Sequence, residues 1–176
     1  MKKILIATTI AAMGIVANAA VANWSVDNIY VSGTSDYAEG YMVYYFDTSA
    51  ITVAAVNSAI AAGDTSFISQ GYAAASLTDD EGYTEGASAS IYSANDAVNG
   101  YLVIFDSSSA ASATHAYVTA VKSTTINSLG ANAALSFGDL VATQTAGNWT
   151  AVAPEPTSGL LLLLGVAGLA LKRKRA

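Results

Sequence analysis

Few side chains in this 176-residue chain are of the types that usually carry out catalysis. His115 is the one histidine, and the absence of cysteine excludes thiol nucleophiles, disulfides and cysteine-ligated metals. A Ser-His-Asp set can be assembled only from His115, Asp106 and one of the serines at 107–109. No Gly-x-Ser-x-Gly motif surrounds those serines. We therefore predict a protein that is not an enzyme.

Acidic side chains are concentrated in one glycine-containing loop at 79–85. Clustered carboxylates beside backbone carbonyls suit Ca²⁺, although the spacing does not match an EF-hand. A solvated acidic turn is the alternative. Glycoside hydrolysis is disfavoured because it needs two carboxyls roughly 5–9.5 Å apart across a sugar cleft. The loop is thus a candidate calcium site, the one cofactor considered, with the ligands Asp79, Asp80, Glu81 and Glu85.

Ten tyrosines and two tryptophans provide a third kind of candidate, because exposed aromatic rings can stack on sugars. Tyrosine is also favoured in half-buried strands, so a purely structural role is the alternative. The tyrosines that the pattern commits least to a core are Tyr30, Tyr37, Tyr72, Tyr83 and Tyr92.

The segments that carry these candidate residues are predicted to be mostly strands, because runs of β-branched and aromatic residues alternate with turn residues. Turns are expected at Gly33, 79–82, Asn99-Gly100, Gly130, 138–139 and 147–148. We predict a mainly β, antiparallel β-sandwich-like single domain at 20–153. Its expected strands are 27–32, 40–46, 66–73, 88–93, 101–105, 116–123, 133–137 and, as a shorter candidate, 149–152.

One short helix is expected to interrupt the strands and to pack over one edge of the sheets. Thr48 or Ser49 can cap its start and Gly63 can end it. Its apolar face is formed by Val53, Val56 and Ile60.

An internal similarity links 40–50 with 100–110, since both run from Gly-Tyr through a hydrophobic strand to Phe-Asp. Two equivalent core strands or a duplicated half-domain explain it, and the single pair favours equivalent strands. The expected core residues are Val43, Phe46, Val103 and Phe105.

The N-terminus has the pattern of a cleavable secretion signal at residues 1–19. Two lysines precede an uncharged apolar run at 4–16, and the small residues Ala17 and Ala19 occupy the positions that signal peptidase reads. A second Ala-x-Ala frame ends at Ala22, but we favour cleavage after Ala19. A buried N-terminal element of the domain is the alternative.

The C-terminus combines three features in a fixed order at 154–176. Pro154-Glu155-Pro156 holds an extended backbone, and the apolar stretch 159–171 can then enter a membrane as a short helix. Thirteen residues reach only ~20 Å, whereas a bilayer core is ~30 Å thick, so this span is marginal. Four cations then stop transfer and fix the domain outside: Lys172, Arg173, Lys174 and Arg175.

Together these features resemble the PEP-CTERM sorting signal of exported proteins in Gram-negative bacteria that make extracellular polysaccharide. The resemblance implies that an exosortase recognises Pro154, Glu155 and Pro156 and cleaves close to them, after transient anchoring in the inner membrane. A permanent tail anchor is the alternative. The expected maturation partners are therefore signal peptidase and exosortase.

Without its two ends, the chain is strongly acidic. Residues 20–153 contain 12 acidic side chains and only one basic residue, Lys122, a formal net charge of −11. Such a surface repels nucleic acid, which we exclude as a partner. We predict a structural or adhesive protein of the cell surface, envelope or extracellular matrix. The alternative is a carbohydrate-binding or carbohydrate-active protein with extracellular polysaccharide as its partner.

Overall fold

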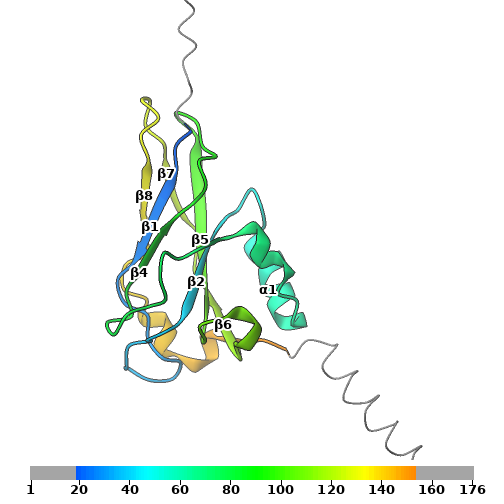
Figure 1. The fold of residues 1–176 in the computed structure, drawn as a ribbon. Helices are drawn as coiled ribbons and strands as arrows, with labels where there is room; N and C mark the ends of the chain where they lie inside the picture. Colours follow the sequence, from blue (N-terminus) through cyan, green and yellow to red (C-terminus); the bar gives the residue numbers. More distant parts are fainter. Residues whose placement is uncertain (1–18, 154–176) are drawn as a thin grey trace, which may run out of the picture.

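Two β-sheets and one α-helix make up the computed structural model, which describes residues 19–153 (Figure 1). The mainly β fold class is therefore confirmed. Most of the signal segment, with Ala17, and the whole tail lie outside the described residues. Within 19–153, no helix combines the length and apolar character needed to cross a bilayer.

The smaller sheet has the strand order β4-β1-β8. Its strands are β4 (Thr84–Ala87), β1 (Ala22–Val26) and β8 (Ala133–Ser136). β1 pairs antiparallel with β4 but parallel with β8, so the expected antiparallel arrangement does not hold for this pair, although the other strand pairs at 19–153 are antiparallel. β1 and β8 are distant in sequence, and a tight hairpin therefore does not force them to run in opposite directions.

The larger sheet is built around the long strand β5 (Ala97–Phe105). One edge of β5 pairs with β2 (Met42–Asp47), and the other edge of β2 pairs with β3 (Tyr72–Ala73). The other edge is shared, because its first half pairs with β7 (Lys122–Thr125) and its second half with β6 (His115–Val118). β9 (Thr150–Ala151) completes the sheet beside β6.

Hydrophobic side chains pack on both faces of the larger sheet. One cluster contains residues of both sheets, among them Trp24, Val43 and Tyr45. The other cluster combines the opposite face of the larger sheet with the α-helix. The four expected core residues, Val43, Phe46, Val103 and Phe105, are all fully buried.

Helix α1 (Val53–Ala62) packs against one face of the larger sheet and contacts β6 and the edge strand β9, in agreement with the expected place over one edge (Figure 1). Thr52 caps it, and the expected caps Thr48 and Ser49 were wrong because they belong to the turn after β2. The backbone N–H of Thr48 bonds the carbonyl of Asn99, and that of Ser49 bonds the carboxylate of Asp47. Gly63 ends the helix in a left-handed conformation, as expected.

Several expected strands were wrong or shorter. Segment 27–32 forms only isolated bridges and 88–93 only a bridge between Tyr92 and Ala20. Segment 66–73 is mostly a 3₁₀ helix, and 116–123 contains two separate strands. The expected turn at Asn99-Gly100 lies inside β5. The 3₁₀ helices are η1 (Ser66–Gln70), η2 (Ala110–Ser112), η3 (Val141–Gln144) and η4 (Ala146–Asn148).

Candidate functional site

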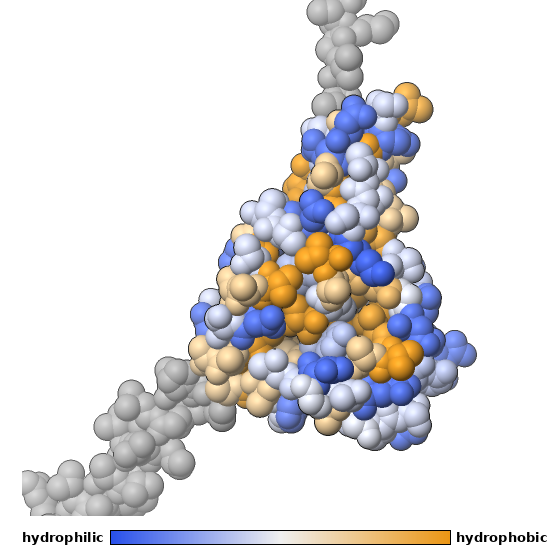
Figure 2. Space-filling view, turned by 180° about the vertical axis from the view of Figure 1, so that it is seen from behind, coloured by the Kyte–Doolittle hydropathy of each residue, from blue (hydrophilic) through white to orange (hydrophobic). Residues whose placement is uncertain are grey.

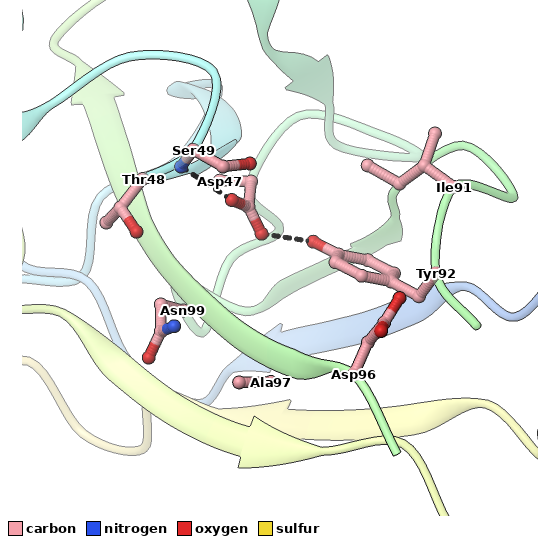
Figure 3. Close-up of a pocket in the computed structure, with 8 residues that line it drawn as sticks. All are labelled: Asp47, Thr48, Ser49, Ile91, Tyr92, Asp96, Ala97 and Asn99. Atoms are coloured by element: carbon pink, nitrogen blue, oxygen red, sulfur yellow. Dashed lines mark hydrogen bonds between the residues drawn. The ribbon is translucent and has the colours of Figure 1, made fainter. Parts of the chain in front are cut away.

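A polar pocket of about 360 Å³ lies where β2 ends and β5 begins (Figure 3). The end of β2 and the turn after it form one wall, and the start of β5 with the segment before it forms the other. Its size is within the range of small-molecule sites, ~300–1,000 Å³. Its lining residues are Asp47, Thr48, Ser49, Ile91, Tyr92, Asp96, Ala97 and Asn99.

Asp47 forms the inner part of the pocket. It is the last residue of β2 and only 5% exposed, although it is an acidic side chain. One carboxylate oxygen accepts the hydroxyl of Tyr92 at 2.5 Å, and the other accepts the backbone N–H of Ser49 at 2.7 Å (Figure 3). Carboxylates that are buried to this degree are normally paired. The two hydrogen bonds lower the cost of burial but supply no positive charge.

Tyr92 connects Asp47 to the core between the sheets. Its hydroxyl lies 3.3 Å from that of Tyr45, whose ring stacks on Trp24. Burial raises the pKa of Tyr92, and its hydrogen bonds to Asp47 and Tyr45 raise it further. Burial likewise raises the pKa of Tyr45 to about 12. Both phenols are therefore protonated at neutral pH.

The outer part of the pocket has a second carboxylate. Asp96 accepts the backbone N–H of Ser93 at 2.7 Å, and the amide oxygen of Asn99 accepts the hydroxyl of Ser123 at 2.7 Å. Ile91, 52% exposed, adds an apolar surface at the rim. Lys122, the one basic residue at 20–153, does not line the pocket and forms no ion pair with the carboxylates of the described chain. The pocket therefore has two carboxylates and no cation.

The acidic loop at 79–85 is organised by its own hydrogen bonds. Asp79 accepts the backbone N–H groups of Glu81 and Tyr83 at 3.0 and 2.8 Å. The Tyr83 hydroxyl donates to Glu85 at 2.6 Å, which raises the pKa of Tyr83. Across residues 19–153, His, Asp and Glu side chains form no group of three or more able to hold a metal. The candidate calcium ligands, including Asp80, thus gain no support from this geometry.

His115 does pair with Asp106, as a catalytic set requires. Its Nδ1 lies 3.3 Å from the Asp106 carboxylate, which also accepts the side chain and backbone N–H of Thr114 at 2.6 and 2.8 Å. Burial favours the neutral form of Asp106, but the bonds from Thr114 and His115 outweigh it and lower its pKa. The hydroxyl of Ser107 forms a hydrogen bond with the hydroxyl of Ser112 and not with His115. In the described chain, no serine hydroxyl hydrogen-bonds to His115, so a triad is not assembled.

The five candidate tyrosines differ widely in exposure. Tyr30 and Tyr92 are buried, which contradicts their assignment as uncommitted to the core, and Tyr72 and Tyr83 are partly buried. Tyr37 is 46% exposed, with its ring centroid 5.2 Å from that of Tyr30. Exposed hydrophobic residues elsewhere form small groups among hydrophilic ones on the face drawn in Figure 2. Tyr37 is therefore the one exposed member of this set.

A second pocket of about 430 Å³ lies beside β1 and β4. Trp24 and Gly86, directly opposed in the two strands, both line it. The indole nitrogen of Trp24 is buried without a hydrogen-bond partner. The other polar side chains that line the second pocket are those of Asn23 and Glu85, so it has fewer polar lining residues than the first.

Sequence reasoning missed the pocket at Asp47, although the Phe-Asp similarity contained part of the signal. The two similar segments supply β2 and β5, which are adjacent and antiparallel, so Asp47 and Asp106 lie at opposite ends of the pair. Each carboxylate accepts a backbone N–H beyond its strand end. Only the fold brings Tyr92 to Asp47. Comparison of the chain with protein-family models, curated proteins and solved structures gave no match.

Proposed function

We propose that this chain is an exported structural or adhesive protein of the cell surface or extracellular matrix, sorted through its C-terminal tail. One observation carries the proposal: Pro154-Glu155-Pro156, an apolar stretch and four cations follow one another directly after the folded residues. A secretion signal at the other end agrees with it. The short apolar stretch favours temporary anchoring by the tail and its removal by an exosortase.

The pairing of β1 supports signal cleavage after Ala19 over cleavage after Ala22. Ala20 exchanges backbone hydrogen bonds with Tyr92, and Ala22 donates to the hydroxyl of Ser88. Both alanines are buried. A chain that began after Ala22 would lose these contacts and the first residue of β1, whereas a chain that began at Ala20 would keep them.

The last described residues support processing close to Pro154. The N–H of Val152 donates to the carbonyl of Thr114, and Val152 packs in the cluster around α1. A Cβ on Gly63 would lie 2.2 Å from the carbonyl oxygen of Ala153, so the helix end and Ala153 are in close contact. A cut at or after Pro154 would therefore leave the packed residues complete.

Removal of the signal and of the tail would then leave the folded residues as the mature protein. The first and last described residues lie at opposite ends of the domain (Figure 1). Attachment through the C-terminal end would turn the β7-β8 connection, with the exposed Leu129, away from the attachment point. We also propose a sandwich-like relation of the two sheets, supported by the hydrophobic cluster that contains residues of both.

The chemistry at the surface favours a non-enzymatic role. His115 lacks a hydrogen-bonded serine among the described residues, and the net charge of −11 at 20–153 disfavours nucleic acid. The exposed ring of Tyr37 is the observation that favours the second candidate, a carbohydrate-binding protein.

Substitution of the motif tests the sorting proposal. The variant Pro154→Ala, Glu155→Ala, Pro156→Ala should remain in the inner membrane with an intact tail, whereas Thr157→Ala, Ser158→Ala should be exported like the parent. Equal export of both variants would contradict recognition of the motif. Fractionation followed by immunoblotting measures the outcome.

Incubation of the exported protein with polysaccharide from the producing cells separates the functional candidates. Unchanged polysaccharide length is the result that a structural or adhesive protein predicts. Shortening of the chains would establish an enzyme instead. Binding that is lost in Tyr37→Ala but kept in Tyr37→Phe would favour the carbohydrate-binding candidate.

A further inference from the structure

We infer that the pocket formed by the ends of β2 and β5 binds an organic cation, a protonated primary amine on a hydroxyl-bearing ring, as in an amino sugar. The eight lining residues come from the end of β2 with the turn after it (47–49) and from residues 91–99, which run into β5 (Figure 3). Binding at this pocket is independent of how the tail is processed.

The buried charge of Asp47 is the first reason. A carboxylate 5% exposed loses most of its hydration, and residues 19–153 provide it with no cationic partner. A second carboxylate, that of Asp96, lines the same pocket. A protonated amine would supply the missing positive charge, and the net charge of −11 at 20–153 would attract it over longer distances.

Unused hydrogen-bonding capacity is the second reason. A carboxylate has about four acceptor positions, and the two oxygens of Asp47 accept one hydrogen bond each, from Tyr92 and Ser49. An ammonium group carries three donors and can use the remaining positions. The side chains of Thr48, Ser49 and Asn99 also line the pocket and can bond ring hydroxyls.

The lining also predicts which ligands are rejected. Anionic sugars and phosphates would meet two carboxylates without a compensating cation, which disfavours them. A neutral sugar would leave the charge of Asp47 unpaired. The exposed Ile91 at the rim provides an apolar surface for the C–H face of a ring. A cationic sugar is thus preferred over neutral and anionic ones.

Isothermal titration calorimetry of the exported protein, purified from culture, tests the inference with three matched probes. Glucosamine carries the ammonium group, glucose replaces it with a hydroxyl, and N-acetylglucosamine replaces it with an uncharged amide. We expect glucosamine to bind roughly tenfold to a hundredfold more tightly than either, as for hydrogen bonds with charged partners. Equal affinities, or no binding of glucosamine, would overturn the inference.

Charge-removing variants locate the site. Asp47→Asn and Asp96→Asn should each weaken glucosamine binding by about tenfold or more, whereas Asp80→Asn, which removes the same charge from the distant acidic loop, should not. Asp96→Asn changes an exposed residue, so it reports even if Asp47→Asn fails to fold. Unchanged affinity in Asp96→Asn, or calcium chloride binding in place of glucosamine, would overturn the assignment.

Discussion

The hydroxyl of Tyr92 donates a hydrogen bond of 2.5 Å to the buried carboxylate of Asp47, 45 residues away in the sequence. This contact connects the segment before β5 to the end of β2. Because Tyr92 also pairs through its backbone with Ala20, the start of the folded chain depends on the same residue. The pocket and the N-terminal boundary are therefore structurally coupled.

Removal of that hydroxyl should destabilise the protein. Tyr92→Phe leaves the buried carboxylate of Asp47 without its side-chain donor, and we expect a loss of about 1–3 kcal/mol in the free energy of unfolding. Tyr83→Phe is the matched control, because it removes a tyrosine-carboxylate bond from an exposed loop. It should cost less than about 0.5 kcal/mol. Chemical denaturation measures both, and equal effects would contradict the burial argument.

Gly100 should not tolerate alanine, although it lies inside a strand. A Cβ at this position would lie 2.1 Å from a ring carbon of Tyr45, so Gly100→Ala displaces the ring that touches Tyr92. We expect a destabilisation of about 1–3 kcal/mol, as for overpacked cores. Gly147→Ala, with open space around its Cβ position, should change stability by less than about 0.5 kcal/mol. A neutral Gly100→Ala in thermal or chemical denaturation would contradict this packing.

Stability should fall at alkaline pH. Burial raises the pKa of Tyr45 and of Tyr101 to about 12, against about 10 in the unfolded chain. The unfolded chain therefore loses these protons first. The stabilisation is complete below pH ~10 and is lost as the pH rises toward the folded pKa values. Denaturant midpoints across this range, followed with phenolate absorbance, measure the effect; a midpoint unchanged above pH ~10 would contradict it.

Acid should weaken the cluster at Asp106. The hydrogen bonds that lower the pKa of Asp106 stabilise the folded chain at pH values above the pKa of an unfolded Asp, ~3.9. This contribution is lost as the pH falls through the pKa of Asp106 in the folded chain. Thr114→Val removes one side-chain donor and should raise the Asp106 pKa, whereas Thr114→Ser should retain most of the lowering. NMR titration of the carboxyl carbon measures each value. A pKa unaffected by Thr114→Val would exclude this bond as a cause.

The sequence predicted the centre of the larger sheet because its signal is local. Runs of β-branched and aromatic residues identified β2 and most of β5, and the similarity of 40–50 with 100–110 pointed to the buried Val43 and Val103. Gly63 ended the helix for a reason that is also local, its left-handed conformation.

The smaller sheet was harder to predict, since its pairing is non-local. β1 begins at Ala22, within the region that resembled a signal cleavage site, and its partners β4 and β8 are distant in sequence. Segment 27–32 buries Ile29 and Tyr30 without forming a ladder, so its β-branched and aromatic residues alone overpredicted a strand.

The pocket could not be predicted for a similar reason. Asn99-Gly100 is typical of a turn, but Gly100 makes room for Tyr45 within β5. The sequence does not encode that tertiary contact locally. The same contact lets Tyr45 reach Tyr92 and completes the environment of Asp47.

Mass spectrometry of the intact exported protein tests the central claim most directly. We expect a chain that starts at Ala20 and ends close to Pro154-Glu155-Pro156, without residues 160–176. An exported protein that retains 160–176 would contradict sorting by a consumed tail. A start at Asn23 would contradict the boundary inferred from the pairing of Ala20 and Ala22.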